Sequence, residues 1–384
     1  MPAPDAPRSP RSGRRSVAVL LLLSLAVLWR PASAHVRAAS FLARFADPAA
    51  HGLLAELGRH ALEVHDVVLA GTRARIYRPV GVDRPPGLVV VHGVHWKGID
   101  EPRLQRFART LAASGVAVLT PEVRELCDYR VDPASIDTIG ASARAFSEQL
   151  GGGRVGVMGL SFAGGLSLIA ASDPRYQAAF AFVVAVGAHD DLGRVLRFFV
   201  TDEAQRPDGT MFRVHAHDYG TVVLEYAHVE DFFPAADLPV ARDTLRSILH
   251  EDFDAAREQA KALSPAAAAT MGRILAHDTA ALTHELMAEI ERLQPSFAAV
   301  SPAAHLGHLS VPVFVLHGSS DQLIPPSEAE WLAHDVPRGR LRDVLVSRAI
   351  EHVGLGEGAT RLSDKLALVH FMGDLLEEAE SQRR

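Results

Sequence analysis

The chain has 384 residues, 48% of them hydrophobic, which is enough to bury a large core, and one α/β domain with an insertion fits this length. A single cysteine excludes an internal disulfide, and no paired Cys/His spacing is present, so we expect no metal ion and no cofactor. Five of the 39 basic and one of the 46 acidic residues lie in residues 1–34, so the remainder carries 34 against 45, a charge of −11. No basic patch remains, and we expect no nucleic-acid partner.

Residues 1–34 have the three parts of a secretory signal. Arg14-Arg15 closes a charged head, residues 17–29 are almost entirely apolar, and Ala32-Ser33-Ala34 is a small-residue cleavage pattern. The apolar stretch is short for a membrane span, which needs about 20 residues. We therefore predict export to the periplasm or the outside of the cell, with a mature chain that begins at His35. The alternative is that the segment is retained as a membrane anchor.

Strands and helices then alternate along the chain. Residues 35–66 are rich in alanine and leucine and predict a helical lead-in, and residues 67–79 predict an antiparallel hairpin at a sheet edge. Continuous apolar runs, typical of strands buried on both faces, follow at 88–91, at 116–119, directly before Ser161 and at 179–186. Helical patterns over 101–114 and 136–150 separate them. Such alternation predicts an α/β fold with a doubly wound, mostly parallel sheet.

The alternation stops after residue 187 and resumes at 311, where another apolar run begins. The interruption reads as helical, and Ser264-Pro265 and Ser301-Pro302 are typical helix starts. We therefore expect an α/β core formed by residues 67–190 and 308–384, with a helical cap insertion over residues 191–307. Aromatic pairs at 198–199 and 232–233 would supply an apolar wall to a substrate pocket. The alternative is a helical bundle that packs away from any site.

One stretch carries a specific chemical signal. A short apolar run ends at Gly159-Leu160-Ser161, and a helical pattern of small residues begins at once. This is the sequence form of a nucleophile elbow, in which a sharp strand-to-helix turn exposes a serine. Ala163 stands where the usual G-x-S-x-G pattern has its second glycine. Taken alone, the stretch fits equally a glycine-rich turn with an incidental serine.

Two further motifs complete a catalytic set, and with them the chain resembles the α/β-hydrolase superfamily. Asp321 follows the apolar run 311–318 and precedes a Leu-Ile-Pro turn, and His352 follows the last expected strand. The order serine, acid, histidine is the order of that superfamily. The resemblance covers roughly residues 67–190 and 308–378, and the cap matches nothing specific. It implies that Ser161 is the nucleophile, Asp321 the acid and His352 the base.

The resemblance also implies an oxyanion hole made by the backbone N–H groups of Phe162 and Val94, although no glycine run follows His92. We expect a serine hydrolase that cleaves a carboxylic ester, a small-molecule substrate, through an acyl-serine intermediate. An acyltransferase or a peptidase with the same triad remains open, as does a non-catalytic binding protein on a hydrolase scaffold. We expect contact with a membrane only if the N-terminal segment is retained as an anchor. The sequence fixes neither the acyl and alcohol groups nor the oligomeric state.

Overall fold

The computed structural model describes residues 29, 31–47, 49–50, 52–351, 354–355 and 361–382. Its centre is an eight-stranded sheet in the order β1-β2-β4-β3-β5-β6-β9-β10. The pairs β1–β2 and β2–β4 are antiparallel, and every other neighbouring pair is parallel. This confirms the predicted doubly wound, mostly parallel sheet. The strands are β1 (Leu62–Leu69), β2 (Thr72–Pro79), β3 (Gly87–Val91), β4 (Ala117–Pro121), β5 (Val155–Leu160), β6 (Phe180–Val186), β9 (Val313–Gly318) and β10 (Leu341–Ser347).

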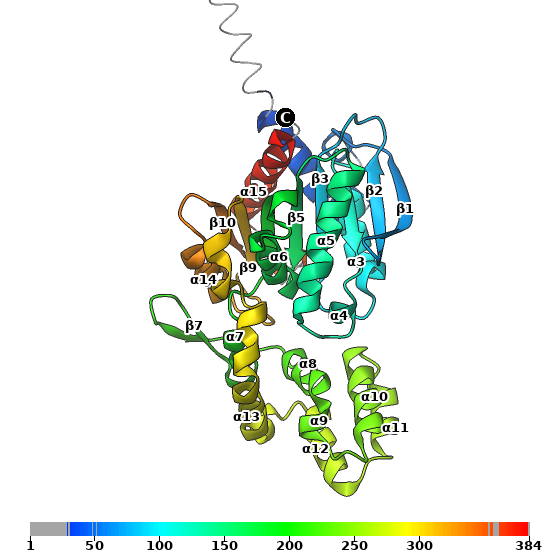
Figure 1. Ribbon diagram of the computed structural model, residues 1–384, viewed down its shortest axis with the longest axis vertical. Helices are drawn as coiled ribbons and strands as arrows, with labels where there is room; N and C mark the ends of the chain where they lie inside the picture. Colours follow the sequence, from blue (N-terminus) through cyan, green and yellow to red (C-terminus); the bar gives the residue numbers. More distant parts are fainter. Residues whose placement is uncertain are drawn as a thin grey trace, which may run out of the picture.

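Helices cover both faces of this sheet because the central strands are apolar on both sides. One face packs against α5 (Pro133–Gln149), α6 (Phe162–Ser172) and α14 (Ser327–Asp335). The other face packs against the N-terminal helix (residues 31–46), α3 (Pro102–Ala112) and α15 (Leu362–Ser381). Short helices α2 (Leu53–Glu56) and α4 (Arg124–Cys127) lie in the connections. The two terminal helices lie side by side (Figure 1).

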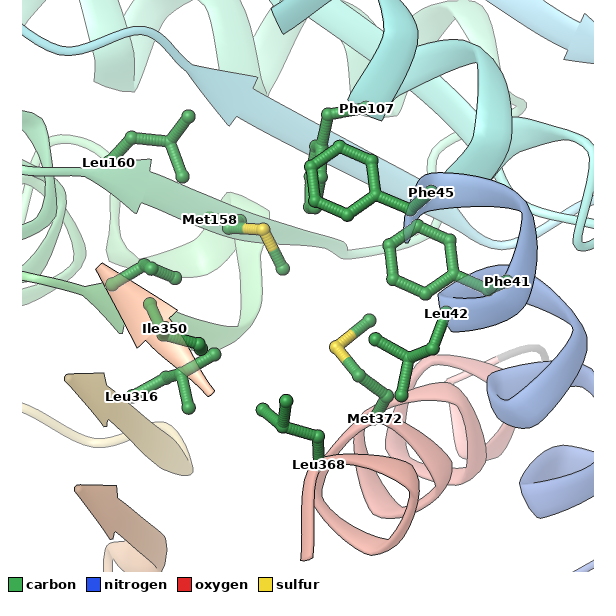
Figure 2. A pocket seen from close by; sticks show the side chains of 11 residues that line it. Phe41, Leu42, Phe45, Phe107, Met158, Leu160, Leu316, Ile350, Leu368 and Met372 are labelled. Carbon is green, nitrogen blue, oxygen red and sulfur yellow. The ribbon is translucent and has the colours of Figure 1, made fainter. Parts of the chain in front are cut away.

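An apolar pocket lies between the sheet and the two terminal helices (Figure 2). It holds about 480 Å³ of empty space, part of it open to solvent. The N-terminal helix contributes Phe41 and Phe45, and α15 contributes Leu368 and Met372. The remaining lining residues are Leu42, Phe107, Met158, Leu160, Val186, Leu316 and Ile350. The N-terminal helix therefore forms one wall of the pocket.

Residues 187–310, which we call the cap segment, leave the sheet after β6 and return to it at β9. Figure 1 shows helices α8 to α12 beyond one end of the sheet. The segment also holds a small hairpin that the sequence analysis did not anticipate, β7 (Glu203–Gln205) with β8 (Met211–Arg213). Its helices are α7 (Leu192–Thr201), α8 (Tyr219–Ala227), α9 (Val229–Phe232), α10 (Leu238–Leu249), α11 (Phe253–Ala260), α12 (Pro265–Leu275) and α13 (Thr279–Phe297).

Two local expectations were wrong. The helical lead-in was expected to reach residue 66, but β1 begins at Leu62, because Leu62 and Val64 alternate with polar residues and pack against the sheet core. Ser301-Pro302 begins only the 3-10 turn Pro302–Ala304. There the Ser301 hydroxyl oxygen accepts a hydrogen bond from the N–H of Leu192 (3.0 Å) instead of capping a helix.

Within the described residues, no helix is both long and apolar enough to cross a membrane.

Candidate active site

Ser161 occupies the sharp turn between β5 and α6. Its φ of 57° and ψ of −135° lie in a region that residues with a Cβ rarely adopt, and such strain persists only where the surroundings impose it. The Ser161 N–H donates to the carbonyl of Val186 at the end of β6 (2.8 Å), which ties the turn to the neighbouring strand. Strand, strained serine and helix together form the nucleophile elbow that the sequence predicted.

Glycines make this turn sterically possible. A Cβ on Gly159 would lie 2.2 Å from the carbonyl oxygen of Ala163. A Cβ on Gly164 would lie 2.6 Å from the Cβ of Ala188 and 3.0 Å from the Gly159 oxygen. Ala163 itself is fully buried. The turn therefore requires glycine at positions 159 and 164, where the backbone segments approach closely. It does not require glycine at position 163.

The loop after β3 lies against Ser161. A Cβ on Gly93 would lie 3.2 Å from the Cβ of Ser161, so the backbone at 93–94 passes directly beside it. On the other side, Phe162 is the first residue of α6, where a backbone N–H has no partner within its own helix. The loop that contains Gly93 and the first residue of α6 thus border the same serine, and the assignment of Val94 and Phe162 as oxyanion donors stays a prediction from the sequence. The positive end of the α6 dipole points to the same place.

His92 positions this loop and is not placed to act as a base. Its Nδ1 donates to the carbonyl of Gly93 (2.7 Å), and its Nε2 accepts from the N–H of Val123 (3.0 Å). Burial lowers the pKa of His92 to about 4, so the ring is neutral at physiological pH. Both ring nitrogens are occupied, and His92 links the chain after β3 to the chain after β4.

Asp321 lies just beyond β9, at the same edge of the sheet as Ser161, and is almost fully buried. Its Oδ1 accepts hydrogen bonds from the N–H groups of Leu323 (2.8 Å) and Ile324 (3.0 Å), which fix the orientation of the carboxylate. Its Oδ2 lies 3.4 Å from Nε2 of His317. The turn after β9 therefore fixes the Oδ1 atom of Asp321 and with it the orientation of the carboxylate.

His352 lies outside the residues that the structure describes. The described strand β11 (Ile350–Glu351) ends one residue before it and pairs with β12 (Gly354–Leu355). Strand β11 contacts β9, the strand that Asp321 follows. The assignment of His352 as the base therefore stays a prediction from the sequence.

The cap segment contacts the loops that follow three of the parallel strands. After β3, the Trp96 ring stacks on His250 at the end of α10, with 4.6 Å between ring centroids. After β4, the Tyr129 hydroxyl donates to the carbonyl of Leu249 (3.1 Å), and after β9 the carbonyl of Gln322 accepts from the N–H of His217 (2.9 Å). These loops lie at the carboxyl ends of the strands, the edge that carries Ser161, so the cap segment lies over that edge.

The four aromatic residues expected to form the substrate wall lie in or against the main hydrophobic core. Phe198, Phe199 and Phe233 are buried in it, Phe232 is partly buried against it, and Phe199 packs on Gly220 of α8. Trp96 is 43% exposed and lies two residues beyond Val94, the expected oxyanion donor.

A buried parallel strand that ends in a strained serine, with an acid after a later parallel strand, defines a hydrolase-type α/β fold. The family model described as alpha/beta hydrolase fold matches residues 88–349, about two thirds of the chain. The protein therefore belongs to the alpha/beta hydrolase family. Ser161 and Asp321 lie inside the matched range, and His352 lies three residues beyond its end.

Similar solved structures include chains named as an esterase, a dienelactone hydrolase and a dipeptidyl peptidase. An esterase from Pyrobaculum calidifontis is 17% identical, with 89% of this chain and 90% of that chain covered and a TM-score of 0.46. A dienelactone hydrolase from Anabaena variabilis is 13% identical over 82% and 97% of the two chains (TM-score 0.44). Dipeptidyl peptidase 4 from Porphyromonas gingivalis is 15% identical over 82% and 36% (TM-score 0.45). No curated protein matches the chain.

Proposed function

We propose that the protein is a serine-dependent hydrolase of carboxylic esters, with Ser161 as the nucleophile. The observation that carries the proposal is the strained backbone of Ser161, held between β5 and α6 and bordered by the loop at Gly93. Strain of this kind is stored at functional sites, because a structural turn would be relieved by a glycine. The buried Asp321 at the same sheet edge supports a triad.

The proposed reaction gives each of these residues a separate step. The Ser161 hydroxyl attacks the ester carbonyl carbon while His352 accepts its proton, since a neutral serine is a weak nucleophile. The N–H groups of Phe162 and Val94 stabilise the negative oxygen of the tetrahedral intermediate. As the intermediate collapses, the C–O bond breaks and His352 returns the proton to the departing alcohol. Water then releases the acid from the acyl-serine by the same steps, and Asp321 orients the imidazole throughout.

Ser161→Ala tests the proposal directly. We expect the variant to lose fluorophosphonate labelling and ester turnover while it keeps its fold by circular dichroism. Ser142→Ala is the matched control, because Ser142 is a fully buried serine on α5, away from the elbow. Loss of His352 should cost nearly as much as loss of Ser161, and the double variant little more, because triad members act as a unit. Full labelling of Ser161→Ala would overturn the assignment.

Substrate series separate the competing activities. A panel of esters of graded chain length, the matching amides and added acceptor alcohols distinguishes hydrolysis of esters from peptide cleavage and from acyl transfer. Faster turnover of amides than of esters, or a product dominated by the acceptor ester, would replace ester hydrolysis. Failure of the wild-type chain to react with a fluorophosphonate would favour a binding protein on a hydrolase scaffold.

We also propose export, which the charged head, the short apolar stretch and Ala32-Ser33-Ala34 support. Cleavage there would remove the first turn of the N-terminal helix, in which Ala34 is fully buried. The intact mass of protein recovered from its host decides the matter. A mature chain beginning at His35 supports export with cleavage, and an uncut chain in the membrane fraction supports an anchor.

A further inference from the structure

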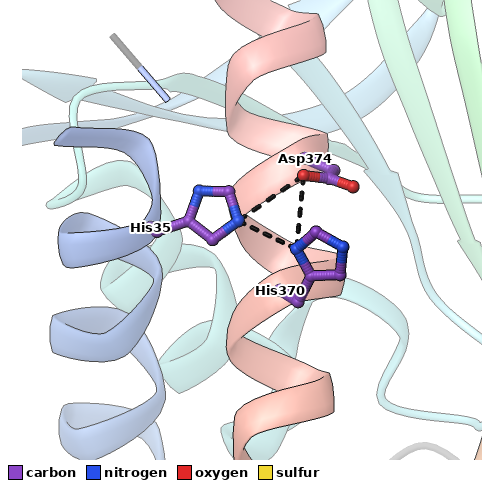
Figure 3. Close-up of side chains that lie close together, drawn as sticks. All are labelled: His35, His370 and Asp374. Carbon is purple, nitrogen blue, oxygen red and sulfur yellow. Dashed lines mark hydrogen bonds and ion pairs between the residues drawn. The ribbon is translucent and has the colours of Figure 1, made fainter. Parts of the chain in front are cut away.

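Three side chains from the two ends of the chain converge away from the active site (Figure 3). His35 belongs to the N-terminal helix, and His370 and Asp374 lie one turn apart on α15. The Nε2 of His35 lies 3.0 Å from the Nδ1 of His370 and 3.5 Å from the Oδ1 of Asp374. The Nδ1 of His370 lies 3.6 Å from the same Asp374 oxygen. Each residue therefore presents one atom to a common point.

The tautomer of His35 makes this arrangement informative. Its Nδ1 lies 2.8 Å from the carbonyl oxygen of Pro31, which can only accept, so Nδ1 carries the hydrogen. In the neutral ring, Nε2 then presents a lone pair toward the carboxylate oxygen of Asp374. Two acceptors that face each other need a hydrogen-bond donor or a cation between them or beside them, and either the Nδ1–H of His370 or a bound metal ion can fill that place. A carbonyl bonded to the far nitrogen is also the usual support of a metal-binding histidine.

The distances match the spacing of ligands around a small divalent ion. Zinc binds imidazole nitrogen and carboxylate oxygen at about 2.0–2.1 Å, which places neighbouring ligands of a tetrahedron about 3.3–3.4 Å apart. The three separations here, 3.0, 3.5 and 3.6 Å, scatter around that value. An ion slightly above the plane of the three atoms reaches all of them, and its fourth position is left for solvent.

The surrounding helix makes room for this arrangement. Gly373 lies in the interior of α15, where glycine costs about 1 kcal/mol relative to alanine. A Cβ on Gly373 would lie 2.7 Å from two atoms of the His35 ring. Gly373 thus allows the imidazole to approach α15 closely enough to face His370 and Asp374.

A second group of possible ligands, which includes His228 and Asp231, contrasts with this one. There Arg292 already pairs with Asp231 (2.9 Å) and with Glu289, the carboxylate near His228. A resident guanidinium supplies the positive charge. Asp374 instead pairs with the two histidines, and among the described residues no arginine or lysine pairs with it.

We propose that His35 Nε2, His370 Nδ1 and Asp374 Oδ1 bind a divalent transition-metal ion, with Zn²⁺ as the best match to two imidazoles and one carboxylate. The bound ion links the N-terminal helix to α15. Because the same two helices line the apolar pocket of Figure 2, this link also fixes that side of the pocket. All three side chains remain in the chain if the segment before His35 is removed, but the Pro31 carbonyl that orients His35 is lost, so the proposal concerns the full-length chain.

Calorimetric titration of chelator-treated full-length protein with Zn²⁺ alone is the primary test. We expect one tight site per chain, and Co²⁺ at the same site should give the visible absorption of a tetrahedral complex. His370→Ala and Asp374→Asn should each weaken Zn²⁺ binding by at least tenfold. The matched control is His334→Ala, another exposed histidine paired with an aspartate, Asp335, and it should bind Zn²⁺ as the wild type does.

Thermal unfolding with and without Zn²⁺ separates a metal site from a hydrogen-bonded surface pair. Zn²⁺ should raise the Tm of the wild type and of His334→Ala by several degrees, and should not raise that of Asp374→Asn. The metal-free Tm values show that the variants are folded. Absence of a stoichiometric site in the wild type would overturn the proposal. So would wild-type affinity for Zn²⁺ in both His370→Ala and Asp374→Asn.

Discussion

Gly159→Ala is the sharpest test of how the elbow positions Ser161. The new Cβ would lie 2.2 Å from the carbonyl oxygen of Ala163, and both Ala163 and Gly164 oppose it with backbone atoms, which cannot rotate away. An ordinary contact begins near 3.4 Å, so strand and helix must separate by about 1.2 Å. Overpacking of this size costs about 1–3 kcal/mol of stability.

The same displacement moves the nucleophile. Ser161 lies between Gly159 and Ala163 on the turn, and a shift of about 1 Å in a catalytic group costs roughly 100-fold in rate. We therefore expect kcat on the best ester to fall by about two orders of magnitude in Gly159→Ala. Gly153→Ala is the control, because a Cβ there meets nothing within 4 Å, and its activity should match the wild type.

Steady-state kinetics and urea unfolding on the same preparations test both parts of this reasoning. A Gly159→Ala protein that is folded and keeps kcat within threefold of the wild type would refute the claim that the close approach at Gly159 determines the position of Ser161. A loss of activity in Gly153→Ala of similar size would show that the effect is not specific to the elbow.

Two further predictions concern the cap. Trp96→Ala removes the stacking on His250 and should shift the relative kcat/KM across an ester chain-length series by about tenfold. Phe198→Ala should instead lower stability by about 3 kcal/mol and leave the relative preference unchanged. Identical preferences in Trp96→Ala and the wild type would contradict this prediction. Burial raises the pKa of Glu225 in α8 to about 8, so between pH 4.5 and 8 the folded chain holds a proton that the unfolded chain releases, and stability falls as pH rises through that window. Glu225→Gln removes this dependence, and its stability advantage over the wild type should grow by roughly 3 kcal/mol between pH 5 and pH 8 in urea unfolding; an advantage that does not change with pH would contradict the assignment.

The sheet and the elbow could be predicted because local patterns determine them. Continuous apolar runs such as 88–91 and 179–186 fit only strands buried on both faces, and the structure places them in the centre of the sheet. The glycines around Ser161 carry a steric requirement that is visible in the sequence itself. Asp321 was identifiable for a similar reason, because the turn that holds it follows directly after an apolar strand.

Other features depend on contacts that no local pattern shows. The hairpin of β7 and β8 was missed inside a segment read as helical, although Pro207-Asp208-Gly209 at its tip is a recognisable turn signal. The cluster of His35 and His370 joins residues 335 positions apart, so neither spacing nor periodicity could reveal it. The role of Trp96 likewise required knowledge of where α10 ends.

The attachment of the cap segment explains why specificity should change at its contact with Trp96. At the base, Arg194 of α7 donates to Asp190 after β6 (2.8 Å) and to Glu328 of α14 (2.8 Å). Burial, reinforced by the charge of Glu328, raises the pKa of Asp190 to about 7, while Arg194 opposes the shift.

Breaking such a buried network would leave a buried charge without a partner. The first helix of the cap segment is therefore held firmly to the core. The stacked pair of Trp96 and His250 instead joins the cap segment to the loop after β3 through an aromatic contact that is partly exposed. A substitution there changes the loop after β3, which also contains Gly93 and Val94, at little cost to the fold. A substitution in the Arg194 network would unfold the segment before it could alter substrate choice.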